Sequence, residues 1–584
     1  SDAYTIDYSC RFNDGDSPYL RRASFQPTSP YTASVWVKRG DLDGANSRVY
    51  TINGADCLNF NTDDTLETER RPSNFDTTRV FRDTGNWYHL LVRSTSSDVK
   101  LYVNGVLDQT VSSTANPYTA GNFDIGASGG SENFDGYIAE FHWIDGTALT
   151  PDSFGETDET YGHWKPIEYT GSHGTNGFYL DFADSSSLGN DASANSNDFT
   201  ATNLAASDQS LDTPTNNFAV MNNLDDTMSS SFKEGNLEIS TDTSDSAGRT
   251  NATFGVSSGK WYWEYYITNK SANGYIGVGE SNGTGTGAIG DSTNDYVYRL
   301  NGNKRNNGSE SSYGSASATN DILGVALDLD SGTTTITVYK NGSTMSTMYS
   351  SLNSGVTYVP NVGDIHSSST QEGVFNFGQE GTFAGNTTAG GNADGNGYGN
   401  FKYAVPTGFL AMCSQNLPEP SVISSQHFSV TTYTGDAGQD VTGIGFQPDL
   451  VWVKARGNSY HHQLHDSVRG PTAGMLNSNQ ATAENNTYQF DSFDSDGFTT
   501  DSGNITGINA SSDSQIAWCW KAGTTTSGTT SGSGTGKAYS ASYNTSAGFS
   551  IINYVGNGTA GHTIPHHLGA TPDLIIIKGR AGTD

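Results

Sequence analysis

Cysteine is scarce in this sequence of 584 residues, which contains only Cys10, Cys57, Cys413 and Cys519. Their wide separation excludes the closely spaced pairs that metal sites and redox motifs require. Basic residues are scarce too, with 29 Lys and Arg against 62 Asp and Glu and a net charge of −33. Such a charge disfavours a nucleic-acid backbone or an anionic membrane surface as a partner, because both would repel it. We expect reduced, structural cysteines and no nucleic-acid partner.

Long hydrophobic runs are missing as well. The first residues, SDAYTIDYSCRF, lack the basic and apolar regions of a signal peptide. No later stretch approaches the roughly 18 apolar residues of a membrane span. Apolar residues at three-and-four spacing, which mark an amphipathic helix, are hard to find. The sequence therefore predicts no signal peptide, no membrane insertion and few helices.

Glycine and aromatic residues are abundant instead. The chain has 69 Gly and 11% aromatic residues, and runs of Val, Ile, Tyr, Trp and Thr bounded by Gly, Asn and Asp recur throughout. Within 134–154, Tyr137, Ala139 and Phe141 alternate with the residues between them, which is the two-residue period of a strand. The sequence predicts an all-β protein built from consecutive β-sandwich (jelly-roll) domains.

Residues 1–204 are predicted to form the first domain. Strands are expected at 31–40, 86–94 and 99–111, and the last segment holds Asn104-Gly105, a strong hairpin signal. The order of the segments WYHLLVR, KLYVNG and DGYIAEFHWIDG resembles that of concanavalin-A/laminin-G-like sandwiches, in the form carried by tail-fibre-like proteins of marine bacteriophages. The resemblance implies a lectin-like jelly roll.

A loop rich in Asp and Asn follows in the same domain. Asp191, Asn195, Asn197 and Asp198 supply oxygen atoms, the ligands that Ca²⁺ prefers. They are our candidate metal ligands, with Ca²⁺ as the only cofactor considered. The alternative is a solvated loop of Asx turns that binds no ion.

Residues 205–218, which include Pro214, are predicted as a linker to a second sandwich at 219–417. There WYWEYYI, YIGVGE and a segment with a second Asn-Gly hairpin, ITVYKNGS, follow one another. Their order resembles that of a SPRY domain. The resemblance implies a non-enzymatic sandwich that binds proteins or ligands through its loops, and we expect each sandwich to fold independently.

The stretch 291–314 is the expected contact surface of this second domain. Its aromatic and arginine side chains look exposed, and these residue types are favoured at binding hot spots. The candidate ligand-binding residues are Tyr296, Tyr298, Arg299 and Arg305.

An internal repeat occupies the C-terminal part of the chain. HFSVTTYTG at 427–435 matches GFSIINYVG at 548–556, and QPDLVWVKARG at 447–457 matches TPDLIIIKGRAG at 571–582. The repeat resembles a domain of unknown function found downstream of laminin-G-like and SPRY domains in marine phage tail proteins.

The repeat sets the remaining domain boundaries. We predict a first β-rich unit at 418–523, a flexible Ser/Gly/Thr-rich linker at 524–547 and the start of a second unit at 548–584. The runs VWV at 451–453 and III at 575–577 are too apolar to remain exposed edges, so we expect inter-chain contacts in this region.

The sequence lacks the common enzymatic motifs. Retaining glycosidases of concanavalin-A-like fold place carboxylates on one strand as E-x-D-x-x-E. The nearest string, Glu156-Thr-Asp158-Glu159-Thr-Tyr161, lacks the final glutamate. No G-x-S-x-G elbow and no P-loop is present. The chain is therefore predicted not to be an enzyme.

These patterns and resemblances together predict a virion protein, assembled in the host cytoplasm. Its expected role is that of a tail fibre or tail-associated adhesin that binds the host cell surface, through a glycan or a protein. Its other expected partners are further virion proteins and itself, as a homo-oligomer with a trimer favoured. The alternatives are a purely structural virion component, such as a head fibre, decoration or adaptor protein, and a polysaccharide-degrading tailspike.

Overall fold

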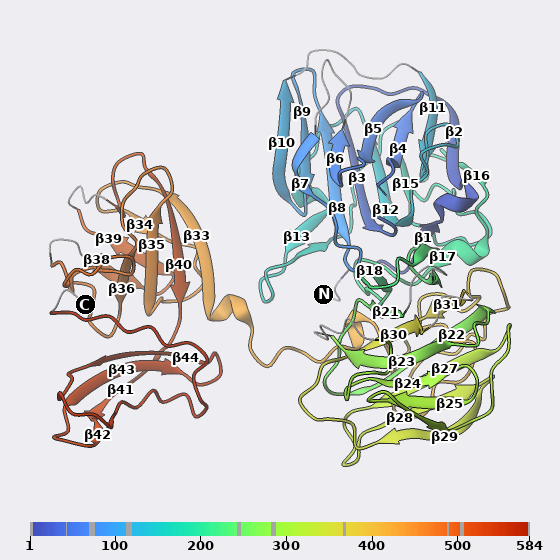
Figure 1. The fold of residues 1–584 in the computed structure, drawn as a ribbon. Coiled ribbons are helices and arrows are strands. Elements are labelled where there is room, and N and C mark those ends of the chain that lie inside the picture. The colour runs from blue at the N-terminus through green and yellow to red at the C-terminus, as the bar shows by residue number, and fades with distance from the viewer. Residues whose placement is uncertain are drawn as a thin grey trace. The chain divides into compact units, whose positions relative to one another are not determined.

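A computed structural model describes residues 4–42, 44–68, 76–112, 120–241, 247–281, 288–365, 370–486, 490–502 and 507–581. Within these ranges the chain forms strands joined by turns (Figure 1). Its helices there are short 3-10 turns: η1 (Asp14–Asp16), η2 (Pro151–Ser153), η3 (Ala206–Asp208), η4 (Ser414–Asn416) and η5 (Ser424–Gln426). None of these described helices has the length and apolar character needed to cross a membrane. The predicted all-β fold is confirmed.

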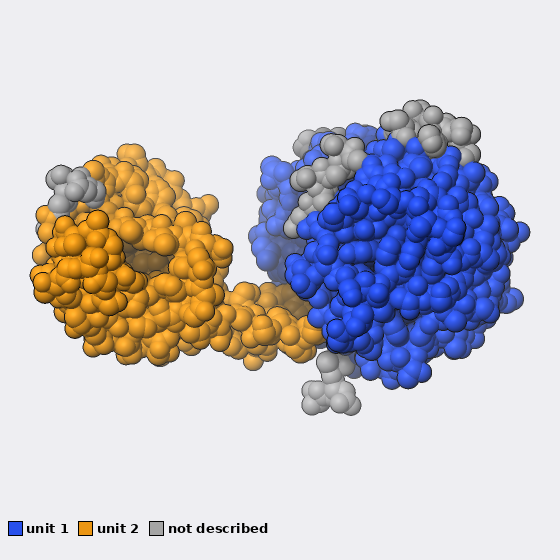
Figure 2. All heavy atoms as spheres, turned by 60° about the horizontal axis from the view of Figure 1, so that its bottom comes forward, with its two compact units in different colours: residues 1–157, 164–417 blue, residues 158–163, 418–584 orange. Residues whose placement is uncertain are grey.

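The chain divides into two compact units, coloured in Figure 2. Unit 1 comprises Ser1–Thr157 and Trp164–Leu417, and unit 2 comprises Asp158–His163 and Pro418–Asp584. Each unit has a buried apolar core of its own.

Unit 1 begins with a two-sheet sandwich. One sheet has the order β10 (Val106–Ser112), β9 (Asp98–Val103), β8 (Tyr88–Ser94), β3 (Tyr31–Arg39), β12 (Gly136–Asp145), β1 (Ser9–Phe12) and β17 (Gln209–Ser210), with β15 (Phe178–Leu180) also paired to β12. The other has the order β16 (Thr200–Thr202), β2 (Tyr19–Phe25), β11 (Gly121–Ile125), β4 (Ser47–Ile52), β5 (Ala55–Phe60), β6 (Thr65–Thr68) and β7 (Asp76–Val80). β13 (Gly155–Thr157) and β14 (Trp164–Pro166) pair with each other.

The predicted hairpin between β9 and β10 is present. Asn104 and Gly105 have φ values of 48° and 78°, the left-handed pair that a tight two-residue turn requires. A Cβ atom at Gly105 would also approach the Trp164 ring to 2.5 Å. Turn geometry and close packing both demand glycine here.

Strand β12 departs from simple alternation. The register against β3 shifts between Ala139 and His142, and Glu140 lies at φ 49°. This bulge places Phe141 in the core between the two sheets, whereas Tyr137 and Ala139 belong to a different buried cluster. The expectation that Tyr137, Ala139 and Phe141 alternate regularly along the strand is wrong, because a bulge shifts the pleat by one residue.

The second sandwich of unit 1 also has two sheets. One has the order β18 (Met221–Asp226), β21 (Gly248–Ala252), β30 (Tyr358–Asp364), β23 (Gly274–Glu280), β24 (Tyr296–Arg299), β25 (Asn303–Asn306) and β26 (Ser309–Ser312). The other has the order β19 (Ser231–Lys233), β20 (Glu238–Ser240), β31 (Glu372–Asn376), β22 (Lys260–Asn269), β27 (Ile322–Asp328), β28 (Thr335–Lys340) and β29 (Ser343–Ser350), and β32 (Leu410–Ala411) runs parallel to β22.

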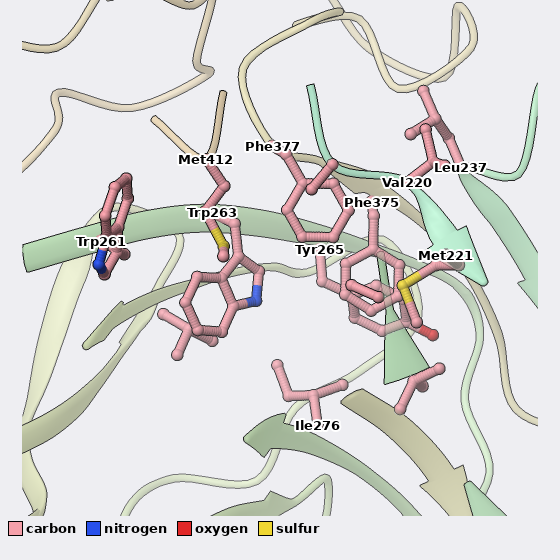
Figure 3. Packing of buried hydrophobic residues seen from close by; sticks show 14 of the residues in the cluster. Val220, Met221, Leu237, Trp261, Trp263, Tyr265, Ile276, Phe375, Phe377 and Met412 are labelled. Atoms are coloured by element: carbon pink, nitrogen blue, oxygen red, sulfur yellow. The ribbon is translucent and has the colours of Figure 1, made fainter. Parts of the chain in front are cut away.

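Large aromatic side chains fill this second core. Trp261, Trp263 and Tyr265 lie on alternate positions of β22 and are almost fully buried. All three belong to the same buried cluster as Phe375 from β31 and Ile276 from β23, and the ring centroids of Tyr265 and Phe375 lie 4.7 Å apart (Figure 3). Trp261 and Trp263 are therefore packing residues of the sandwich core.

The segment 205–218, predicted as a linker, is built into the fold. It contains η3 and β17, and β17 pairs with β1 of the first sandwich. Asp212 is fully buried and accepts hydrogen bonds from Lys38 Nζ at 2.7 Å and from Trp87 Nε1 at 3.0 Å. Burial lowers the pKa of Lys38 and raises that of Asp212, which disfavours both charges. The attraction between the two groups offsets part of this cost.

The two sandwiches of unit 1 also share apolar contacts. Trp36, Trp87, Tyr137 and Ala139 from the first sandwich lie in the same buried cluster as the core of the second. Arg11, with 1% of its side chain exposed, forms ion pairs at this junction with Asp208, Glu234 and Glu380. This shared core favours joint unfolding over the predicted independence of the two sandwiches.

The described residues of unit 2 form four sheets. They are β33 (Phe428–Thr434), β40 (Ser514–Trp520), β35 (Leu450–Ala455), β36 (Gln463–Asp466) and β37 (Leu476–Asn477); β34 (Asp440–Val441), β39 (Gly497–Thr500) and β38 (Phe490–Asp494); β41 (Thr524–Thr529), β43 (Ala538–Asn544) and β44 (Phe549–Tyr554); and β42 (Ser531–Gly532) with β45 (His562–Thr563).

Residues 524–547 form strands rather than the predicted flexible linker. β41 pairs along its whole length with β43, and β43 pairs with β44. A Ser/Gly/Thr-rich composition indicates flexibility only while no neighbouring strand supplies hydrogen bonds. The other predicted domain boundaries remain predictions.

Cys10, Cys413 and Cys519 are free and buried. Burial is the first cause that raises the pKa of each thiol, and the pKa of Cys413 and of Cys519 reaches about 12. The side chain of Cys57 lies outside the described residues. These three thiols are inert packing groups.

The Lys38–Asp212 pair predicts joint destabilisation of both sandwiches. Asp212→Asn leaves a buried ammonium group without its counter-charge and should lower the free energy of unfolding by about 3–5 kcal/mol. Urea unfolding measures the loss, and hydrogen exchange should speed up in β8 and β22 alike. Lys233→Ala, which removes an exposed pair with Glu238, should change stability by less than about 0.5 kcal/mol. Faster exchange confined to the first sandwich would contradict a shared unfolding unit.

Candidate functional site

The stretch 291–314 folds into the edge of a sheet. β24, β25 and β26 lie side by side, and β26 is the last strand of the sheet. Tyr296 and Tyr298 on β24 are only 6% and 0% exposed, because their side chains enter the core of the second sandwich. The expectation that these two tyrosines are exposed is wrong, since strand alternation turns them inward.

The two predicted arginines lie on the opposite face of this edge. Arg299 Nη1 donates to both carboxylate oxygens of Glu310, at 2.8 and 3.0 Å, and Nη2 donates to Asn273. Arg305 is paired with Asp291. The side chains of Arg299 and Arg305 are 19% and 16% exposed. Each guanidinium group is thus held in place on a side chain that is partly exposed.

Hydrogen bonds and ion pairs at this edge stabilise the charged forms of Glu310 and Arg305. Burial alone would raise the pKa of Glu310, but hydrogen bonds from Asn303 and Arg299 lower it below its ordinary value. Burial acts to lower the pKa of Arg305, and the bond to Asp291 raises it above its ordinary value. Charged donors that are already ordered can bind hydroxyl or carboxylate groups with little further loss of side-chain conformational entropy. We call the surface made by Arg299, Arg305 and Glu310 the arginine edge.

The structure brings together the predicted calcium ligands, but as a hydrogen-bonded loop. Asp191 Oδ1 accepts from the backbone N–H groups of Tyr179 and Ser193, both at 2.9 Å, and Oδ2 accepts from that of Asn197 at 2.8 Å. Burial alone would raise the pKa of Asp191, and these hydrogen bonds lower it.

The side chains of the other three predicted ligands also form hydrogen bonds within the protein. Asp198 Oδ1 accepts from the backbone of Asp191, and Asn197 Oδ1 accepts from Arg22. The amide of Asn195 donates to the backbone carbonyls of Gly174 and Gly177. Within the described ranges, no three His, Cys, Asp or Glu side chains are placed to hold a metal ion. The geometry favours Asx turns, and calcium binding remains a prediction.

Sequence reasoning missed a cluster of titratable groups at the β12 bulge. Glu140 Oε2 accepts from Tyr4 OH at 2.8 Å and lies 3.3 Å from His142 Nε2, while Tyr179 OH donates to Oε1. His142 Nδ1 in turn lies 3.1 Å from His173 Nε2. Burial acts to raise the pKa of Glu140, but its hydrogen bonds bring it below the ordinary value.

The carboxylate of Glu140 is held by two tyrosine hydroxyls and an imidazole, which differs from the carboxylate pair of a glycosidase. A glycosidase needs two facing carboxylates about 5 Å or more apart. In the sequence, only the close spacing of Glu140 and His142 pointed to this cluster. Their partners Tyr4 and Tyr179 lie far away along the chain. No local pattern could have joined them.

Three family models match parts of the chain. Residues 13–153 match the concanavalin A-like lectin/glucanases superfamily, residues 260–380 match the SPRY domain, and residues 423–584 match a domain of unknown function, DUF7483. The predicted resemblances to a concanavalin-A-like sandwich and a SPRY sandwich are therefore confirmed at the level of the fold. A comparison with curated proteins found no match.

Solved structures resemble single sandwiches of the chain. The SPRY domain of human HERC1 is 21% identical over 24% of this chain and 87% of its own, with a TM-score of 0.21. A pentraxin from Limulus polyphemus is 19% identical over 25% of this chain and 80% of its own, with a TM-score of 0.21. Domain 4 of the arabinanase AbnA from Geobacillus stearothermophilus, in complex with arabinotriose, is 24% identical over 22% of this chain and 67% of its own, with a TM-score of 0.19.

Buried histidines predict that unit 1 loses stability in acid. Burial lowers the pKa of His89 to about 3 and that of His173 to about 4, whereas both titrate near about 6.5 in an unfolded chain. Between these values the unfolded chain binds more protons, so the free energy of unfolding falls as pH falls from about 6.5 to about 4. Urea midpoints at pH 7.5, 6.5, 5.5 and 4.5 measure the slope.

The variant His89→Gln tests how much His89 contributes to this pH dependence. It should be less stable at pH 7.5, because the contacts of His89 with Ser34 and Trp164 are altered, yet it should show a shallower pH slope. Parallel slopes for the variant and the parent protein would contradict the assignment.

Proposed function

We propose that the chain is a non-enzymatic binding protein, an adhesin whose N-terminal sandwiches contact a host cell surface. In this proposal it is a bacteriophage virion protein, such as a tail fibre or a tail-associated adhesin, assembled as a homo-oligomer with other virion proteins. The resemblance of the sandwich order and of the C-terminal repeat to marine phage tail proteins supports the phage setting. The matches to concanavalin-A-like and SPRY families support a binding role.

The arginine edge carries the proposal for where binding occurs. Its two guanidinium groups are fixed by carboxylates of the same sandwich, on side chains that are partly exposed. Planar, ordered donors suit the paired hydroxyl groups of a glycan, which we propose as the ligand class. Many weak contacts of this kind would add up on an oligomer through effective concentration.

Binding by full-length protein to a glycan array and to host cells tests the proposal. The double variant Arg299→Ala/Arg305→Ala should bind at least about tenfold more weakly, because two ordered donors are lost. Arg299→Lys keeps the charge but not the bidentate geometry, so an intermediate loss is expected.

Lys340→Ala is the matched control for this experiment. Lys340 forms a comparable, partly exposed ion pair with Asp321, but it lies on β28 in the other sheet. This variant should bind as the parent protein does. Equal binding by all variants would remove the arginine edge from the proposal, and release of oligosaccharides from host polysaccharide would overturn the non-enzymatic role.

A further inference from the structure

The side-chain amine of Lys38 has three partners on the segment that joins the two sandwiches of unit 1. Nζ donates to Asp212 Oδ2 at 2.7 Å, to Asn217 Oδ1 at 2.7 Å and to the carbonyl of Phe218 at 2.9 Å. Lys38 belongs to β3 of the first sandwich, whereas the three partners lie between β17 and β18. An amine, a carboxyl group and a side-chain amide therefore meet at one point.

This meeting point is shielded from water. The side chains of Lys38 and Asp212 are both 0% exposed. The ring centroid of Tyr137 lies 5.7 Å from Nζ, and Trp87 Nε1 donates to Asp212 Oδ1 at 3.0 Å. Both aromatic rings belong to the buried cluster that the two sandwiches share. Because burial favours the neutral amine, a lysine in such a setting can act as a nucleophile.

The amide of Asn217 turns its carbonyl group toward this amine. Its Nδ2 donates to the carbonyl of Gly85 at 2.8 Å, while Oδ1 accepts from Lys38. Since a C=O bond is about 1.2 Å long, Cγ of Asn217 lies within about 3.9 Å of Nζ. Reacting atoms in a near-attack geometry are about 3–3.5 Å apart. A small rotation of the amide brings Cγ within reach of the amine.

Asp212 is placed to move protons between the two groups. Its Oδ2 accepts from Nζ, and its Oδ1 accepts from the N–H group of Phe218, the residue after Asn217, at 3.3 Å. Burial raises the pKa of Asp212 and lowers that of Lys38, which favours transfer of a proton from Nζ to the carboxylate. The transfer leaves a neutral amine beside a carboxylic acid.

We propose that Lys38 and Asn217 form an intramolecular isopeptide bond, with Asp212 as the proton carrier. The lone pair of Nζ forms a bond to Cγ of Asn217, and the bond between Cγ and Nδ2 breaks. Asp212 accepts the proton that Nζ gives up and supplies one to Nδ2, which leaves as ammonia. One amide replaces another, so the reaction needs no oxidant, reductant or activating group. The ion pair between Lys38 and Asp212 is the state before this bond forms.

The bond ties the two sandwiches together covalently. It joins residues that are 179 positions apart, and most strands of the first sandwich lie between them. A cross-link that closes a long loop reduces the conformational freedom of the unfolded chain, as a disulfide does. Unlike a disulfide, the amide is stable in reducing agent. A chain pulled at its two ends would carry the load through the link, and residues 39–216 would not extend.

The mass of the full chain, measured after denaturation, tests the proposal. It should lie about 17 Da below the mass of the sequence, because one ammonia molecule is lost. A protease digest should also contain one branched peptide that joins the segments carrying Lys38 and Asn217. Ring closure of Asn217 onto its own backbone releases ammonia as well, but it leaves the two segments separate.

Three variants identify the participating groups. Lys38→Met removes the amine and Asn217→Ala removes the carbonyl group, so each chain should have the full mass of its own sequence. Asp212→Asn removes the proton carrier and should lower the yield of the branched peptide at least about tenfold. Asn216→Ala is the matched control, because Asn216 accepts from the backbone of Gln415 and should leave the link intact.

The parent chain alone can overturn the proposal, whether or not any variant folds. The full mass of the sequence would overturn it, and so would a loss of ammonia without a branched peptide. Lys38 would then be an ammonium group whose three donors are satisfied by hydrogen bonds. A branched peptide that persists in Asn217→Ala, or an unchanged yield in Asp212→Asn, would contradict the assigned roles. None of these results depends on glycan binding by the arginine edge.

Discussion

A buried ion pair between Lys38 and Asp212 lies where the two sandwiches of unit 1 meet. Lys38 projects from the outer face of β3, and Asp212 comes from the segment that leads to the second sandwich. Neither charge would be stable in an apolar setting alone, so each fixes the place of the other. Lys38 also donates to Asn217 and to the carbonyl of Phe218, at 2.7 and 2.9 Å. These bonds tie β3 to the start of the second sandwich.

Sequence patterns predicted the parts of the fold that depend on neighbouring residues. The turn at Asn104-Gly105 was predictable because left-handed backbone favours these two residues. The second Asn-Gly turn, at Asn341-Gly342, was predictable for the same reason. Strand existence and the order of the sandwiches followed from period-two runs and turn spacing.

Features set by distant residues could not be predicted in this way. The bulge at Glu140 depends on how β12 is paired with β3, and no local signal marks it. The burial of Tyr296 and Tyr298 was missed because loop-like composition concealed a strand with an inward face. At the candidate site, Arg299 and Arg305 were identified by residue type, but their partners Glu310 and Asp291 became evident only from the pairing of β24 to β26.

Strand β1 has partners that are made much later than β1 itself. Cys10 pairs with Ile138 on β12 and with Gln209 on β17, separations of 128 and 199 residues. At about 5–20 residues per second, translation delivers β17 about 10–40 s after β1 has left the ribosome. During that interval β1 can pair with β12 but lacks its second neighbour, and Lys38 has no counter-charge. The junction between the two sandwiches therefore cannot form until the segment that carries Asp212 has been synthesised.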